Sequence, residues 1–188
     1  MREMNETKVP PTTVAAIASI IGALLLIIAF FLPYAAARDE YRADLLAYPD
    51  LILDKELGLS NADVVDLSLF EYASIYAGQT ESAFGPIAVI YLAVIGAAAL
   101  TALLALLFAL LRKATPAAIF AMLNMSTVLL LNWDFEDRGM LPNTTYDWGI
   151  AKWVYLISAI LVIASAIWLF ILKHRAKATA AAERTTNA

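Results

Sequence analysis

The sequence predicts an all-α membrane protein, a four-transmembrane-helix bundle with a partly helical extracellular cap. Three observations predict it. First, 62% of the 188 residues are hydrophobic, whereas ordinary soluble domains are roughly 45–50% apolar. Second, the chain contains four long apolar runs. Third, its basic residues are concentrated in the segments at one end of those runs. We expect a single membrane domain over residues 1–188.

The four apolar runs are long enough to cross a bilayer. A hydrocarbon core of roughly 30 Å needs about 20 helical residues. The runs cover about residues 14–33, 87–111, 116–133 and 152–172. Lys152, at the start of the last run, is the one charged residue in them. They leave two outer loops, 38–85 and 134–150, and two tails, 1–12 and 173–188.

Local signals mark where the spanning helices begin. A Thr or Ser before a helix can cap its free N–H groups, and Pro is tolerated in a first turn. We therefore expect Thr12 or Thr13 to cap the first helix and Thr115 to cap the third. Pro86 falls in the first turn of the second.

Basic residues indicate the orientation. The two tails and the short link 112–115 hold eight, whereas the two longer loops, together with Lys152 directly after the second of them, hold five in about twice the length. The positive-inside rule then places both termini in the cytoplasm and the longer loops outside a bacterial cell membrane. These loops are acidic, with net charges of −7 over 38–85 and −3 over 134–150. In an alternative interpretation, cleavage at Ala35–Ala37 removes the first span.

The beginning of the first outer loop has a helical pattern. Tyr41, Leu45 and Tyr48 recur at helical spacing, and Pro49 ends the pattern. The first spanning helix is therefore expected to extend beyond the membrane, with a bend at Pro33.

A second helix is expected near the end of the same loop. Ser68 and Glu71 match the capping-box pattern that opens helices. This helix would place Leu69, Tyr72 and Tyr76 on one face. That face either covers the bundle as a lid or binds a partner protein. Leu69, Tyr72 and Tyr76 are therefore candidate interaction residues.

Small residues recur along three of the spans. Such residues let helices approach closely in lipid, where burial of apolar surface supplies little driving force. The second span has a ridge at every fourth position: Ala93, Ala97, Thr101, Ala105 and Ala109. The first span offers Ala18 and Gly22, and also Ala15, Ser19 and Ala23, and the fourth offers Ala151, Ser158, Ala159, Ser165 and Ala166. These ridges predict packing within the chain, and alternatively a homo-oligomer.

Asn124 is the polar residue nearest to mid-membrane. A buried amide in a spanning helix needs a partner. We expect a hydrogen bond to a neighbouring helix, and alternatively a position lining a polar cavity.

The densest polar cluster follows the third span. It contains Asp134, Glu136, Asp137 and Arg138. We expect an acidic turn or a local ion-pair network, and we include these four among the possible interaction residues. Lys152 is expected to pair with Asp147 or with one of these acids. A divalent-cation site is the alternative, because carboxylate oxygens are preferred ligands of calcium and magnesium.

Several functions are disfavoured. The chain has no cysteine and one histidine, so thiolate metal sites are excluded, and no cofactor or metal is predicted. A pI near 4.9 without a basic patch disfavours nucleic acid as a partner. We find no catalytic motif, and we expect a protein that is not an enzyme.

Three stretches carry a resemblance. Residues 131–139 (LNWDFEDRG), 146–149 (YDWG) and 68–71 (SLFE) resemble small four-pass membrane proteins of bacteria that have no assigned activity. The order of a long first outer loop, a short inner link and a shorter second outer loop is similar to that of claudins. The claudin signature of a Trp and two Cys in the first outer loop is absent, so the likeness implies topology only.

The function that we predict is that of a scaffold or accessory subunit, which uses its acidic extracellular loops. Its expected partners are the lipid bilayer and a membrane or extracellular protein. One alternative is a channel or transporter component, with Asn124 facing a polar cavity. Another is a sensor of an extracellular ligand or cation.

Overall fold

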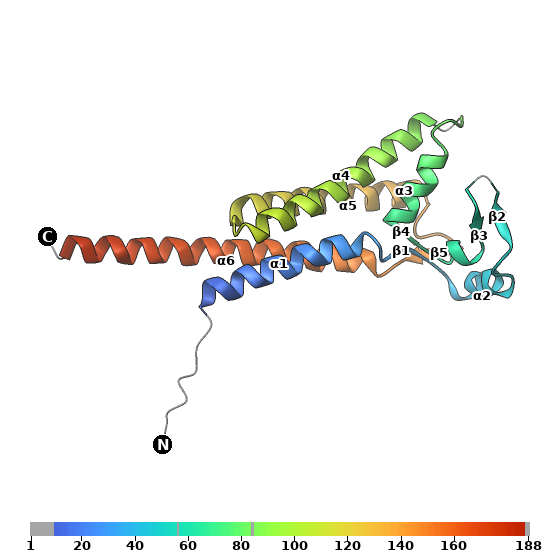
Figure 1. The fold of residues 1–188 in the computed structure, drawn as a ribbon. Helices are drawn as coiled ribbons and strands as arrows, with labels where there is room; N and C mark the ends of the chain where they lie inside the picture. Colours follow the sequence, from blue (N-terminus) through green and yellow to red (C-terminus); the bar gives the residue numbers. More distant parts are fainter. Residues whose placement is uncertain (1–9, 56, 84, 187–188) are drawn as a thin grey trace, which may run out of the picture.

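The computed structural model describes residues 10–55, 57–83 and 85–186. Four long helices form a bundle, and the shorter elements gather at one end of it (Figure 1). The long helices are α1 (Pro11–Ala29), α4 (Gly85–Leu110), α5 (Ala114–Asp137) and α6 (Ala151–Thr186). All four are long and apolar enough to cross a membrane, α6 through its part Ala151–Ala176. The prediction of an all-α, multi-pass membrane protein is confirmed.

We call the end of the structure that holds these shorter elements the cap, which comprises the described residues of 33–83 and 138–150. Its helices are α2 (Asp39–Ala47), α3 (Leu69–Gly78) and the short 3-10 turn η1 (Ala62–Val64). Its strands are β1 (Pro33–Ala37), β2 (Ile52–Asp54), β3 (Leu59–Ser60), β4 (Asp66–Ser68) and β5 (Tyr146–Trp148). The helix expected after Ser68 is present as α3, whereas the helical pattern at Tyr41 and Leu45 forms a separate helix, α2, and not an extension of the first spanning helix.

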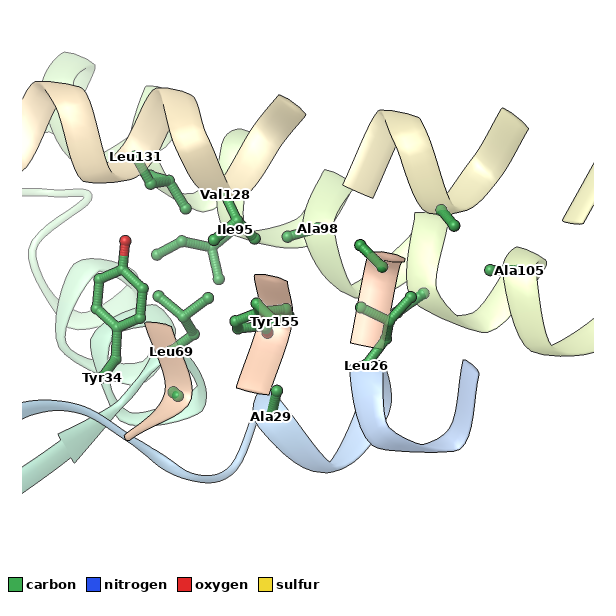
Figure 2. Close-up of a cluster of buried hydrophobic side chains, with 14 of the residues drawn as sticks. Leu26, Ala29, Tyr34, Leu69, Ile95, Ala98, Ala105, Val128, Leu131 and Tyr155 are labelled. Carbon is green, nitrogen blue, oxygen red and sulfur yellow. The ribbon is translucent and has the colours of Figure 1, made fainter. Parts of the chain in front are cut away.

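The four long helices pack in a ring. Helix α1 contacts α4 and α6, and α5 also contacts α4 and α6. Because successive spans run in opposite directions, every neighbour in this ring is antiparallel. Buried side chains follow the centre of the bundle from Tyr34 and Leu69 at the cap to Ala105 further along (Figure 2). The cap therefore sits directly on the bundle core.

The helix ends differ from several expectations. Helix α1 ends at Ala29, so it does not extend through Pro33 into the cap. A proline ring clashes with the carbonyl four residues earlier, and for Pro33 that carbonyl belongs to Ala29. At the other end α6 continues to Thr186, through most of the expected tail 173–188. Residues 1–9 of the other expected tail lie outside the described residues.

The expected threonine caps are also wrong. Helix α1 begins directly at Pro11, before Thr12 and Thr13. Helix α5 begins one residue before Thr115, and Lys113 occupies its N-cap position without a side-chain hydrogen bond. Proline at the first position presets the helical φ angle and has no N–H that needs a cap. Pro86 lies in the first turn of α4, as expected.

The bundle is packed on a seven-residue repeat. In α4 the buried residues are Ala88, Tyr91, Ile95, Ala98, Ala102, Ala105 and Ala109, and in α5 they include Ala117, Ala121, Asn124, Val128, Leu131 and Phe135. Buried positions that alternate in steps of three and four residues form one stripe along a helix. In left-handed helix packing this stripe faces the neighbouring helix along its whole length. The predicted four-residue ridge of α4 is therefore only partly correct, because its first members, Ala93 and Ala97, are exposed.

Helix α1 comes close to α6 at Gly22. A Cβ atom built on Gly22 would lie 2.9 Å from Cγ2 of Val162 and 3.1 Å from the carbonyl oxygen of Ser158. The small residues predicted on α6, Ala151, Ser158, Ala159, Ser165 and Ala166, are all buried. Packing within the chain, the first of the two expectations for these ridges, is thus confirmed for α1 and α6.

A small antiparallel sheet, which the sequence pattern did not predict, joins the two cap segments. Strand β1 is central, with β4 from the first segment on one side and β5 from the second on the other. Ala35 lies opposite Leu67 in β4 and opposite Trp148 in β5. The three alanines of the alternative cleavage site, Ala35–Ala37, therefore form the middle of this sheet.

We predict that Gly22→Ala destabilises the bundle, whereas Gly96→Ala does not. The new methyl group at position 22 meets Val162 and a backbone oxygen, and overpacking typically costs about 1–3 kcal/mol. The same methyl group at position 96 has no atom within 4 Å. Thermal unfolding of the purified protein in mild detergent should show a lower Tm for Gly22→Ala only. Equal melting temperatures would contradict the close approach.

Candidate functional site

The predicted interaction face of α3 lies against the protein's own bundle. Ser68 and Glu71 form the expected capping box, in which the Ser68 hydroxyl accepts from the Glu71 N–H at 3.2 Å. Leu69 is 0% exposed and Tyr76 is 9% exposed, while Tyr72 is half-buried. Helix α3 packs on α4. Of the two roles expected for this face, the structure places it as a lid.

Aromatic rings fill the boundary between the cap and the bundle. The Tyr34 ring lies edge-to-face against Tyr72, Phe135 and Trp148, with centroid distances of 6.4, 5.8 and 5.5 Å. Such edge-to-face pairs add to the energy of apolar burial. Figure 2 shows Tyr34 beside Leu69, with its hydroxyl directed toward the α5 side of the core. That hydroxyl donates a short hydrogen bond to Oδ1 of Asn132.

The acidic cluster lies in the last turn of α5, whereas we expected it in a loop. The helix continues to Asp137, and Gly139 with φ of 64° follows it. This conformation suits glycine and commonly ends helices. The four residues Asp134–Asp137 therefore share one helical turn, which fixes their spacing.

The expected ion-pair network is present. Arg138 Nε donates to Asp134 Oδ1 at 2.9 Å, and the Tyr91 hydroxyl donates to the other oxygen of Asp134. Lys152 Nζ donates to Glu136 at 3.2 Å, so Lys152 pairs with an acid of the cluster. Asp137 is exposed. This network ties α4, α5 and α6 together where they meet the cap.

Lys152 also lies over the Trp148 ring, with Nζ 3.9 Å from its centroid. Asp147, the other partner expected for Lys152, instead faces Arg38 at 3.6 Å. The contact of Lys152 with Trp148 connects β5 to α6, and the contact of Asp147 with Arg38 connects β5 to the start of α2. Most of the residues that carry the sequence resemblance therefore meet at the joint between cap and bundle.

Among residues 10–55, 57–83 and 85–186, no group of three or more His, Cys, Asp or Glu side chains is placed to hold a metal ion. Asp134, the least exposed acid of this cluster, uses both oxygens for Tyr91 and Arg138. The cluster thus acts as an ion-pair network in this structure.

Asn124 makes the interhelical hydrogen bond that its position predicts. Its Nδ2 donates to the Ala98 carbonyl oxygen at 2.7 Å and to Thr101 Oγ1 at 3.3 Å. The side chain is 0% exposed. Asn124 therefore joins α5 to α4 in the middle of the bundle.

Sequence reasoning missed the most prominent apolar surface of the cap. Five large apolar side chains within residues 46–53 of the cap are more than half exposed: Leu46, Tyr48, Leu51, Ile52 and Leu53. We call them the cap patch. Figure 1 shows α2 and the β2–β3 hairpin, which carry or border this patch, at the end of the molecule farthest from the bundle. The signal was present as the run of three aliphatic residues between two loop aspartates, Asp50 and Asp54.

Acidic side chains accompany the cap patch. The same segment holds exposed carboxylates at Asp39, Glu40, Asp44, Asp50 and Asp63. Beneath it, α2 packs on the sheet through Leu45, which forms a small core with Ala37 and Val65. The patch therefore sits on a folded support.

Comparison of the chain with models of protein families, with curated proteins and with solved structures gives no match. The resemblance to small four-pass bacterial proteins and the claudin-like topology stay predictions from the sequence.

Several tyrosines of the cap have raised pKa values, among them Tyr76 and Tyr146. Burial raises the pKa of Tyr76 to about 12, with Asp134 adding to the shift. Burial likewise raises the pKa of Tyr146 to about 12, with Tyr41 adding to it. The Tyr146 hydroxyl donates to the Val64 carbonyl oxygen at 2.7 Å, a contact that only the protonated form can make.

We therefore predict that the cap loses stability in alkali. An unfolded tyrosine ionises near pH 10, whereas these two keep their protons up to about pH 12. Between those values the unfolded state binds fewer protons, so the free energy of unfolding falls as pH rises. Thermal unfolding between about pH 8 and pH 11 should show a steeper decline for the natural protein than for Tyr146→Phe.

The control is Tyr48→Phe, because Tyr48 is 71% exposed. This variant should retain the full alkaline decline. If Tyr146→Phe declines as steeply as the control, Tyr146 is not held in its protonated form by the fold.

Proposed function

We propose that this multi-pass membrane protein is a non-enzymatic scaffold or accessory subunit that binds a partner protein through the cap patch. The observation that carries the proposal is the group of five exposed apolar side chains, Leu46, Tyr48, Leu51, Ile52 and Leu53, at the end of the molecule away from the bundle. Apolar side chains on the lipid-facing surface of spanning helices are expected. On a segment beyond the helices they indicate an interaction surface.

The energetics favour a protein as the ligand of this patch. Full burial of one large apolar side chain contributes about 1.5–3 kcal/mol, so a few of them provide the core of a binding site. Leu51 and Leu53 lie two residues apart along an extended segment, which places them on the same face. A protein with an apolar contact region can cover such a face.

The charges specify the partner further. The exposed carboxylates of α2 and of the segment around the β2–β3 hairpin form a polar surround for the apolar contact. Interfaces commonly have an apolar centre and a polar rim of complementary charge. The partner is therefore expected to carry basic residues around an apolar centre.

We infer that the cap lies outside the cell membrane. The opposite end of the bundle carries Arg112, Lys113 and Lys173, and Lys173 Nζ donates to the Arg112 carbonyl oxygen at 3.3 Å. The positive-inside rule assigns such an end to the cytoplasm. A partner of the cap would then be an extracellular protein or the external part of another membrane protein.

The binding prediction can be tested with the full chain. The tagged protein is cross-linked in membranes of its source, solubilised in mild detergent and purified with its partner. Leu51→Asp together with Leu53→Asp should lower recovery of a stoichiometric partner about tenfold, because desolvated carboxylates oppose apolar contact. Ser74→Asp together with Ala77→Asp, which adds the same two charges at exposed positions of α3, should leave recovery unchanged.

Recovery of the chain alone, or equal recovery with the Leu51 and Leu53 variant, would contradict the proposal. If the recovered partner is a second copy of the same chain, the accessory role is replaced by homo-oligomerisation through the patch.

The orientation has its own test. A reporter that is active only in the cytoplasm, fused after Thr179, should be active, and one fused within the cap after Gly58 should be inactive. Gly58 has φ of 66°, and a Cβ atom added there would have no other atom within 4 Å, so the position tolerates an insertion sterically. The opposite pattern of activity would contradict the inferred topology.

A further inference from the structure

A groove runs between α4 and α5 on the lipid-facing side of the bundle, near the cap. Its volume is about 190 Å³. The walls are mostly apolar, with Ile87, Ile90 and Val94 from α4 and Leu130 and Trp133 from α5. Ile90 is 63% exposed and Trp133 is 61% exposed. Since these positions belong to spanning helices, a lipid acyl chain is the material that surrounds them.

One end of the groove is polar. Asp134, Arg138 and Tyr91 line it there. The Arg138 guanidinium is held by the Asp134 hydrogen bond and lies 5.6 Å from the centre of the Tyr91 ring. Trp133 beside them is a residue type that prefers the boundary between lipid and water. The groove therefore has the amphipathic order of a phospholipid, apolar along its length and polar at one end.

Arg138 is oriented to bind a phosphate group. Its Nε donates a hydrogen bond to Asp134. Its two terminal nitrogens donate no hydrogen bond to any of the described residues. Arginine binds phosphate oxygens through paired N–H groups. The contact at Nε leaves those terminal N–H groups available for a ligand in the groove.

The local charge distinguishes between headgroups. Asp134 is paired with Arg138, and Glu136 is paired with Lys152, while Asp137 is exposed on the same turn. The cluster thus has one surplus negative charge. Asp137 comes four residues after Trp133, which lines the groove, so the two lie on the same side of α5. A headgroup with a phosphate alone would be repelled by the surplus charge, whereas a headgroup with both a phosphate and an ammonium group complements Arg138 and Asp137 together.

We propose that this groove binds one phosphatidylethanolamine molecule, with an acyl chain between α4 and α5, the phosphate at Arg138 and the ammonium at Asp137. The site involves residues different from the cap patch, and it stands independently of the proposed partner protein.

The test uses delipidated full-length protein in mild detergent, titrated with phosphatidylethanolamine or with phosphatidylglycerol of the same acyl chains. Native mass spectrometry counts the lipids that are bound. One phosphatidylethanolamine should be retained per chain, with at least tenfold preference over phosphatidylglycerol. Ile90→Trp, which fills the groove, and Arg138→Gln, which removes the phosphate donor, should each reduce retention about tenfold or more.

Two matched variants serve as controls. Leu100→Trp adds the same bulk at an exposed position of α4, where Leu100 is 57% exposed. Lys113→Gln removes a positive charge from an exposed position at the other end of the bundle. Both should retain the lipid. Melting temperatures of all four variants establish that they fold.

Three results would overturn the proposal. The first is that no lipid remains on the natural protein. The second is that Ile90→Trp and Arg138→Gln retain as much lipid as their controls, which is the behaviour of lipid that merely surrounds the bundle. The third is equal retention of phosphatidylglycerol, which contradicts recognition of the ammonium group.

Discussion

The hydrogen bond from the buried Tyr34 hydroxyl to Asn132 is the interaction on which the rest of the cap depends. Tyr34 is 0% exposed, and an unpaired hydroxyl at such a position would cost about 1–3 kcal/mol. Pro33 ends helical structure just before it, so Tyr34 can lie in a strand and point down into the bundle. Once β1 is fixed in this way, β4 and β5 pair on its two sides. The positions of α3 and of the second cap segment then follow.

Much of the bundle could be predicted from the sequence because lipid imposes simple rules. A spanning helix must be long and apolar, and the four runs met that condition without ambiguity. Capping chemistry at Ser68 and Glu71 was equally local, so α3 was predictable. The four-residue ridge through Ala93 and Ala97 failed for a tertiary reason. The neighbouring helices decide which stripe of an Ala-rich helix is buried. In α4 the buried stripe is the one with the seven-residue repeat.

The sheet could not be predicted from local pattern. Strand β1 reads Pro-Tyr-Ala-Ala-Ala, and alanine has low preference for strands. Its extended form is imposed by partners that are distant in sequence, Asp66–Ser68 and Tyr146–Trp148. The same limitation affected the candidate site. Leu69 and Tyr76 have the residue types of an interface, but only the packing of α3 on α4 shows that the bundle already covers them. The cap patch was missed because residues 51–53 are too few to form a periodic pattern.

The last turn of α5 and the residue after it have two structural roles, carried by two sets of neighbouring residues. On the inner side of α5 Phe135 packs against Tyr34, and the exposed Glu136 binds Lys152, so this turn holds the cap in place. On its outer side Arg138 and Asp134 form the polar end of the groove. A ligand at Arg138 would therefore contact Tyr91, whose ring stacks on Tyr76 of α3 at 4.6 Å between ring centroids. The cap patch shares no residue with either set. Because substitutions at sites without shared partners generally add in free energy, lipid binding and partner binding should behave as separable properties of this chain.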